Sequence, residues 1–219
     1  MGEGVKGRPS VSRRYHSPRR TEQAARTRHD VLVAARELLV EQGYAATTIA
    51  DIARRAQVAV DTVYATVGRK PALLRELVET AISGTDEATP AEDRAYVIAI
   101  RAAETARDKI TIYARAVTDM QQRMAPVFLA LRDAAATDPA SGALWTEISQ
   151  RRAENMRLFA ADLRATGEVR SDLTDAEVAD IVWSMNAAEY WELLVTQRGW
   201  APARFTDWLI DSWARLLLA

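Results

Sequence analysis

Cysteine is absent from the 219 residues, and histidine occurs only twice, as His16 and His29. Without cysteine the chain forms neither disulfides nor thiolate sites, which is typical of a cytoplasmic protein. The sequence also lacks the spacing of a metal site, a glycine-rich phosphate loop and a nucleophile elbow. We therefore expect no catalytic residue, no metal and no cofactor, and we predict that the protein is not an enzyme.

Long apolar runs, glycine and proline are scarce as well. No stretch of 18 apolar residues predicts a membrane span, and the polar, basic N-terminus does not resemble a signal peptide. Glycine occurs 9 times and proline 7 times, and alternating β-branched runs are missing. The sequence therefore favours an all-helical protein, whose 219 residues fill one large domain or two modest ones.

The net charge is close to zero, but the charges are unevenly distributed. The formal net charge is −1, whereas residues 1–28 hold eight basic and two acidic residues. Because this segment is rich in Gly, Ser, Pro and Arg and has no apolar periodicity before Arg20, we expect residues 1–22 to be a basic disordered arm. Such an arm either contacts DNA or is a solvated tail, and the sequence leaves both readings open.

The segment from Thr47 to Lys70 carries the most informative pattern. It predicts two short helices joined by a tight turn at Val58, and the second helix carries Val63 and Val67 inward, four residues apart. The apolar face of the first helix is formed by Ile49, Ile52, Ala53 and Ala56. This layout is a helix-turn-helix, which presents the N-terminus of its second helix to the DNA major groove.

Residues 28–80 resemble the TetR-type, or tetracycline-repressor-like, family of bacterial regulators. The resemblance rests on positions matched in order, namely Gly43-Tyr44, Thr47-Thr48, Ile52-Ala53, Val58, Thr62-Val63-Tyr64 and Lys70. The departures from the family pattern are Gln57, Ala59, Thr66 and Val67. The resemblance implies an all-α fold with an N-terminal three-helix DNA-binding domain over residues 23–70. A larger helical domain for effector binding and dimerisation would follow over residues 71–219.

The outward residues of the second helix, together with the resemblance, define the expected DNA contacts. They are Thr47, Thr48, Ala59, Val60, Asp61, Thr62, Tyr64, Ala65, Thr66, Arg69 and Lys70. We expect Thr48, Tyr64 and Lys70 to hold phosphates, and the start of the second helix to face the bases. Two of these residues keep a structural alternative: Asp61 can simply complement the helix dipole, and the Tyr64 ring can pack on the first helix.

Caps and periodicity also predict the other helices. The first is expected from Thr21 or Ala24 to Gln42, and the fourth begins at Pro71. In the body we expect helices over residues 91–103, 105–123, 126–136, 141–166, 174–198 and 202–218. Pro126 separates two of them, and Thr174 with Glu177 forms a capping-box signature at the start of another.

The last two expected helices are apolar nearly all round. Such helices need a second burying surface, which is either the same pair in another subunit or the interior of one chain. We favour a homodimer, because TetR-type proteins dimerise through such a pair. The expected interface residues are Ile181, Trp191, Leu194, Trp208, Leu209, Trp213 and Leu216.

The resemblance also implies an effector pocket in the body. Its expected walls are Tyr96, Ile100, Tyr113, Met120, Met124, Phe128, Trp145, Met156, Phe159, Trp183, Asn186 and Tyr190. Apolar walls with a few polar groups suit a small hydrophobic effector. The predicted function is a ligand-responsive repressor that binds double-stranded operator DNA as a homodimer. An activator of the same fold, or an architectural DNA-binding protein with a solid core and no effector, is the alternative.

Overall fold

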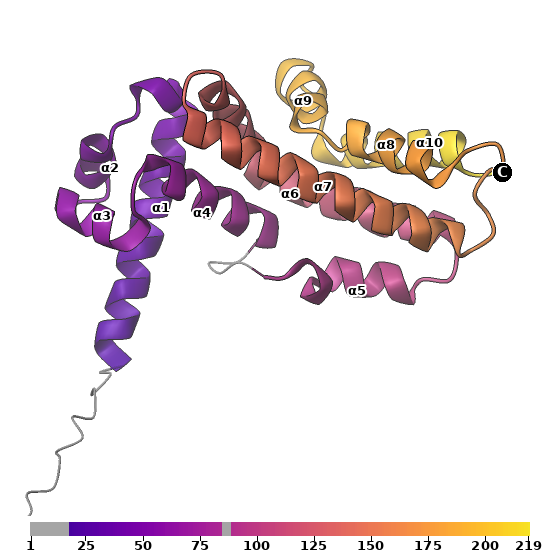
Figure 1. Ribbon diagram of the computed structural model, residues 1–219, viewed down its shortest axis with the longest axis horizontal. Coiled ribbons are helices and arrows are strands. Elements are labelled where there is room, and N and C mark those ends of the chain that lie inside the picture. The colour runs from indigo at the N-terminus through magenta and orange to yellow at the C-terminus, as the bar shows by residue number, and fades with distance from the viewer. Residues whose placement is uncertain (1–17, 85–88) are drawn as a thin grey trace, which may run out of the picture.

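The computed structural model describes residues 18–84 and 89–219 (Figure 1). The expected basic arm lies outside these ranges up to residue 17, whereas residues 18–22 already belong to the first helix. The regular elements of the described ranges are helices, accompanied by one isolated antiparallel bridge between Val169 and Leu218. No helix in these ranges has both the length and the apolar character that a membrane span requires.

The helices form an N-terminal head and a larger body, which confirms the predicted all-α, two-part fold. The head contains α1 (Pro18–Ala46), α2 (Ile49–Arg55) and α3 (Val60–Val67), and α4 (Lys70–Ser83) leads into the body. The body contains η1 (Ala91–Asp93), α5 (Ala95–Ala102), α6 (Ala106–Ala135), α7 (Pro139–Arg164), α8 (Asp175–Met185), α9 (Ala188–Trp191), the π-helical turn η2 (Glu192–Gln197) and α10 (Pro202–Leu217).

The long helix α6 is the centre of the body. It packs against α1 and α4 of the head side and against α5, α7, α9 and α10 of the body. Figure 1 shows α6 and α7 running side by side, with α8 and α10 over one side of the pair and α5 on the other. Phe128 and Leu131 of α6 and Phe205 and Trp213 of α10 are among the largest fully buried side chains. The core is therefore built by layers of helices on α6.

The predicted helix break at Pro126 is wrong, because α6 runs through it without interruption. Proline has no N–H for the carbonyl four residues earlier, which here is that of Gln122. Arg36 of α1 donates from Nη2 to this Gln122 oxygen over 3.4 Å. The carbonyl that proline leaves without an intrahelical partner is thus bonded by a side chain from the head, which sequence periodicity does not reveal.

The single helix predicted over residues 174–198 is divided instead into α8, α9 and η2. The break falls at Asn186, which is buried. Its backbone oxygen accepts from Gln121 Nε2 over 2.7 Å, and its side-chain Oδ1 accepts from Arg152 Nη2 over 2.5 Å. Hydrogen bonds to α6 and α7 therefore hold Asn186 outside a continuous helix. The expected capping box of Thr174 and Glu177 is present at the start of α8.

Gln57 in the turn between α2 and α3 is the only non-glycine residue of the described ranges with a positive φ, at 56°. For an L-residue with a Cβ, the left-handed region costs roughly 1–2 kcal/mol, whereas glycine adopts it readily. The Val58 N–H donates to the Ala53 carbonyl over 3.0 Å and fixes the turn around this residue. The turn therefore holds Gln57 in an unfavourable backbone conformation.

We expect Gln57→Gly to stabilise the protein. Relief of the backbone strain, less the added entropy of a glycine in the unfolded chain, predicts a gain of about 0.5–1 kcal/mol. In a chain of this size that corresponds to a rise of about 2 °C in Tm, measured by circular dichroism. Gln57→Ala is the matched control, because alanine keeps the Cβ and should leave Tm within about 1 °C of the parent. An equal rise in Tm for both variants would show that relief of backbone strain is not the cause of the stabilisation.

Candidate functional site

A capping box fixes the start of the helix-turn-helix. Thr48 Oγ1 accepts from the backbone N–H of Asp51 over 3.1 Å, and the Thr48 N–H donates to Asp51 Oδ2 over 3.3 Å. These reciprocal bonds satisfy two N–H groups that a helix end otherwise leaves without partners. The Thr48 hydroxyl also donates to Asp51 Oδ2 over 2.6 Å, and this bond is the main cause of the lowered pKa of Asp51. Thr48 therefore lies exposed at the head surface, where α2 begins.

The second helix of the motif, α3, buries one face and exposes the other. Val63 and Val67 are buried, as the four-residue spacing predicts, and α3 packs against α1 and α2. Val60 and Tyr64 are 40% and 48% exposed, although both carry large apolar groups. The expected DNA contacts that are exposed are Thr48, Ala59, Val60, Asp61, Tyr64, Ala65 and Arg69. Thr62 and Thr66 are partly buried, and the Thr66 hydroxyl donates to the Thr62 carbonyl over 2.6 Å.

The N-terminus of α3 has no side-chain cap. Its N-cap residue is Ala59, which offers no oxygen to the first N–H groups, and Asp61 is the only acid in the first turn. Such an end has unsatisfied N–H groups and a partial positive charge, a combination that binds phosphate. The exposed end of α3 therefore suits contact with an anionic backbone.

Two of the expected DNA contacts, Thr47 and Lys70, form hydrogen bonds within the head. Thr47 is 1% exposed, and its hydroxyl donates to the Gly43 carbonyl over 2.8 Å. Lys70 donates from Nζ to the Tyr44 carbonyl, and Nζ lies 3.8 Å from the centroid of the Tyr44 ring. Burial lowers the pKa of Lys70. Thr47 is thus buried within the head, and Lys70 joins the start of α4 to the end of α1.

Polar contacts join the head and α4 to α7. Arg75 of α4 makes a bidentate pair with Glu147 of α7, with distances of 2.5 and 2.6 Å. One turn further along, Glu79 of α4 pairs with Arg151 of α7 over 2.5 Å. The guanidinium of Arg75 lowers the pKa of Glu147. The two ion pairs therefore connect α7 to α4, the helix that begins beside the helix-turn-helix.

A cavity of about 210 Å³ lies in the body between α4, η1, α5, α6 and α7. Of the expected pocket residues, it is lined by Tyr96, Ile100, Tyr113, Met120, Met124, Met156, Phe159 and Asn186. Its other walls are Ile82, Ala91, Glu92, Arg94, Val97, Arg101, Val117, Ile148, Arg151, Arg152, Asn155, Leu158 and Asp162. The wall is thus contributed by the helices on both sides of α6, and Ile82 brings α4 itself into it.

The remaining expected pocket residues, Phe128, Trp145, Trp183 and Tyr190, do not line this cavity. Phe128 packs on Trp145, with ring centroids 4.6 Å apart, and Tyr190 packs on Trp208 at 5.4 Å. Trp183 lies against Arg152, whose guanidinium is 5.2 Å from its ring centroid. Phe128 is buried in the core, and the other three aromatic residues are partly buried against it. Periodicity identifies a buried face but does not tell which part of it is hollow.

Arg152 is the important cavity residue that sequence reasoning missed. In the sequence it follows Arg151 on a helix rich in charged residues, so the pair has the pattern of a solvated face. The only signal in the sequence that Arg152 faces the interior was the pair of apolar residues one turn away on either side, Ile148 and Met156. Only the packing of α7 against α6 and α8 separates the two neighbouring arginines into different environments.

The expected dimer surface is only partly open in a single chain. Leu209 and Trp213 are fully buried, and Trp191 is nearly so, which corrects their assignment to an interface. Their side chains fill the core of the chain, where α10 packs against α6 and α8. Ile181, Leu194 and Trp208 are partly buried and Leu216 is 42% exposed. These four residues are the expected interface positions that retain surface for a partner.

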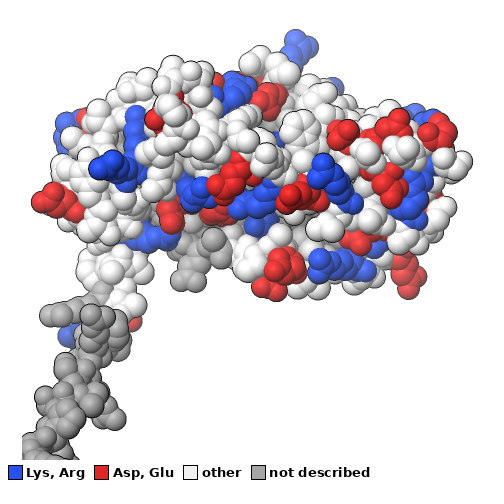
Figure 2. All heavy atoms as spheres, viewed as in Figure 1, with Lys and Arg blue, Asp and Glu red and all other residues white. Residues whose placement is uncertain are grey.

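Charged residues of both signs are interleaved over the visible face of the body (Figure 2). Within residues 18–84 and 89–219, no group of three His, Asp or Glu side chains is arranged to hold a metal ion. The buried polar residues of the body are Lys109, Thr118, Gln121, Ser141 and Asn186 within the described ranges, and of these Asn186 lines the cavity.

Comparisons with known proteins agree with this geometry. Residues 31–77 match the family model described as bacterial regulatory proteins, tetR family. No curated protein matches the chain. Among solved structures, SmeT in complex with triclosan superimposes with a TM-score of 0.69 at 16% identity, and covers 89% of this chain and 92% of its own.

Two further structures have the same fold. A protein from Saccharomonospora viridis, described as a transcriptional regulator in complex with choline, has a TM-score of 0.66 at 17% identity over 89% of this chain and 99% of its own. NalD, described as the secondary repressor of the MexAB-OprM multidrug efflux pump in Pseudomonas aeruginosa, has a TM-score of 0.55 at 18% identity, over 90% and 98% of the two chains. The helix-turn-helix segment of the chain therefore matches the model of the tetR family of bacterial regulatory proteins, and the chain as a whole shares the all-helical fold of the solved structures.

Proposed function

We propose that the protein is a non-enzymatic, ligand-responsive repressor that acts as a homodimer on a palindromic operator in the bacterial cytoplasm. The observation that carries this proposal is the course of α4. This helix begins at Lys70, beside the helix-turn-helix, and brings Ile82 into the wall of the cavity. One rigid element thus links the DNA-facing surface to the place where a small molecule fits.

The exposed face of α3 is the part that would enter the major groove. Ala59, Val60, Asp61 and Ala65 are exposed on this face, and we assign the base contacts to them and to Thr62 beside them. The small side chains allow close approach of the helix, and Asp61 suits the amino group of a cytosine. Thr48, Tyr64 and Arg69 would hold phosphates at the edges of the groove.

Ligand response would pass through α4 and α7. A ligand shifts the protein between two states only if it binds one of them better. The α4–α7 pairs, Arg75–Glu147 and Glu79–Arg151, link the cavity wall to α4, so a ligand that displaces α7 also displaces the head. The complexes of SmeT with triclosan and of the Saccharomonospora viridis protein with choline support the view that this fold accepts small molecules.

The alternative functions are less well supported. An architectural protein without an effector would have a solid body, whereas this body contains a cavity lined by apolar and polar side chains. An activator would have the same fold. Repression is preferred because NalD, a protein of the same fold, is described as a repressor.

Arg69→Ala should weaken DNA binding at all sequences alike. Arg69 is exposed at the N-cap of α4, and a contact with one phosphate in each protomer contributes about 0.9 to the salt slope per contact. We therefore expect the slope of log Kd against log salt to decrease by about two for a dimer, measured by fluorescence anisotropy at several salt concentrations.

Lys70→Ala is the control for this measurement. Because Lys70 is bonded to the Tyr44 carbonyl, its loss should lower the stability of the head by about 1 kcal/mol and change the salt slope by less than one unit. A larger change of slope for Lys70→Ala than for Arg69→Ala would contradict these assignments.

A duplex from the promoter region next to the protein's own gene should bind specifically. We expect a Kd of about 10⁻⁸ M or lower that survives excess nonspecific competitor DNA, as is usual for specific regulators. Reporter transcription from this promoter should fall when the protein is present. An increase in transcription would favour an activator, and loss of all binding in competitor would reject operator recognition at this site.

Leu216→Arg should weaken dimerisation. Leu216 is an exposed apolar residue on α10, and a charge there would be buried without a partner in a symmetric interface. We expect monomers by analytical ultracentrifugation and weaker operator binding. Val33→Arg is the matched control, because Val33 is equally 42% exposed but lies on α1 of the head. A dimer that persists in Leu216→Arg would place the interface elsewhere.

A further inference from the structure

Arg152 of α7 places a positive charge in the cavity wall. Its Nη2 donates to Asn186 Oδ1 over 2.5 Å and to the Trp183 carbonyl over 3.2 Å. Its guanidinium carbon lies 5.2 Å from the ring centroid of Trp183 and 5.6 Å from that of Phe128. Neutral groups therefore fix the position of this guanidinium, and burial lowers the pKa of Arg152.

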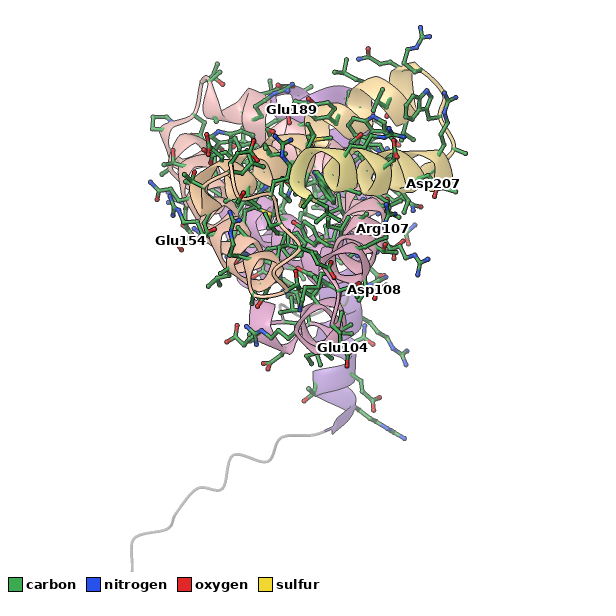
Figure 3. All side chains as sticks on the ribbon, turned by 90° about the vertical axis from the view of Figure 1, so that its right-hand side faces the viewer. Glu104, Arg107, Asp108, Glu154, Glu189 and Asp207 are labelled. Atoms are coloured by element: carbon green, nitrogen blue, oxygen red, sulfur yellow. The ribbon has the colours of Figure 1, made fainter. Side chains whose placement is uncertain are left out.

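No carboxylate forms an ion pair with Arg152 in the described ranges, unlike the neighbouring Arg151, which pairs with Glu79 over 2.5 Å. Glu189, whose charge acts on Arg152, is itself paired with Arg132 over 3.1 Å. The acidic side chains labelled in Figure 3 lie at the periphery of the body. Arg152 is partly buried, and a charge that is partly withdrawn from water is stabilised by an opposite charge, which no ion pair of the described ranges supplies here.

A second donor lies beside Arg152. Asn186 Nδ2 donates to the Tyr113 hydroxyl over 2.8 Å, so the same amide joins Tyr113 and Arg152. The Tyr113 hydroxyl in turn donates to Met156 Sδ over 3.3 Å. A thioether is a weak acceptor, and a carboxylate oxygen would take this proton far more favourably. Burial raises the pKa of Tyr113, which keeps its hydroxyl protonated as a donor.

The rest of the cavity is mainly apolar. Ile100 of α5, Val117 and Met120 of α6 and Phe159 of α7 line it. Its volume of about 210 Å³ is below the roughly 300–1,000 Å³ of sites for drug-sized ligands. A small molecule with an apolar body and one polar end matches this distribution.

We propose that the cavity binds a small monocarboxylate, whose carboxylate pairs with Arg152 and accepts from Tyr113 while its apolar body lies against α5 and α6. This inference rests on the proposed ligand response, and it names the chemical class of the ligand. The anion replaces the missing counter-charge of Arg152, and a charge-assisted bond replaces the weak bond to sulfur.

The acidic residues that line the cavity do not make a cationic ligand more favourable than a carboxylate. Asp162 lies ten residues after Arg152 on α7, about 15 Å along the helix. Glu92 is exposed on η1, and Arg94 and Arg101, at the N-cap and near the end of α5, line the cavity as well. A cationic ligand would have to place its charge away from Arg152, whereas a carboxylate meets donors of complementary charge.

The test compares acids with neutral molecules of the same size. Phenylacetate, cinnamate and octanoate, and their primary amides, are titrated into the full-length protein by isothermal calorimetry, and Tm shifts are recorded in parallel. We expect at least one acid to bind at least about tenfold more tightly than its amide. Arg152→Gln should abolish this difference, whereas the control Arg157→Gln, an exposed arginine of α7 that does not line the cavity, should preserve it.

Tyr113→Phe gives a second readout if Arg152→Gln unfolds, as judged by circular dichroism. It removes only the hydroxyl and should reduce the preference for the acid by about threefold or more. Equal affinity for acids and amides, failure of every acid to bind at about 1 mM, or an unchanged preference in a folded Arg152→Gln variant would overturn the proposal.

The proposed function is tested separately by operator release. An acid that binds through Arg152 but leaves the operator complex intact upholds the carboxylate site and rejects the ligand response. Release of the operator by a neutral amide, with no binding of any acid, would uphold the ligand response and reject the carboxylate site.

Discussion

The uninterrupted course of α6 is the constraint on which the rest of the structure depends. With 30 residues it is about 45 Å long, and it packs against α1, α4, α5, α7, α9 and α10. The Gln122 carbonyl that contacts Arg36 of the head and the cavity residues Met120 and Met124 lie within five residues of one another, just before Pro126. The bond from Arg36 to the Gln122 carbonyl satisfies the acceptor that proline leaves free, so the helix can serve both the head and the cavity.

Polar groups inside the body have a specific arrangement. Asn186 interrupts the helical path after α8, and the same residue joins Gln121, Arg152 and Tyr113 through its backbone and side chain. Buried polar groups are costly unless they are bonded, and a fully bonded network fixes one geometry. The break between α8 and α9 is therefore coupled to the shape of the cavity wall.

Local signals predicted the parts of the fold that depend on local interactions. The capping of α2 by Thr48, the start of α3 at Val60 and the inward spacing of Val63 and Val67 follow from neighbours within one or two turns. Several cavity residues, such as Tyr113 and Met156, were also predictable, because they belong to a mainly apolar set that contains a few polar groups. The family resemblance then supplied the role of these elements.

Other features depend on residues far apart in the sequence. Thr47 looked like a surface hydroxyl, but it is buried and bonded to the Gly43 carbonyl. Leu209 and Trp213 looked like an interface because one helix pattern does not tell whether a second chain or the same chain covers it. Arg152 resembled a solvated charge, because its separation from Arg151 arises only when α7 packs.

The contact of α1 with α6 also bears on the modularity of this architecture. Arg36 projects from the head onto the body, and Tyr44 at the end of α1 bonds through its hydroxyl to Asp138, the N-cap of α7, over 3.3 Å. A chimera that grafts a foreign reading head onto this body would lose both contacts unless it retained them. Under the proposed function, the DNA specificity of such a protein is therefore easier to change by substitution on the exposed face of α3 than by transplanting the entire head.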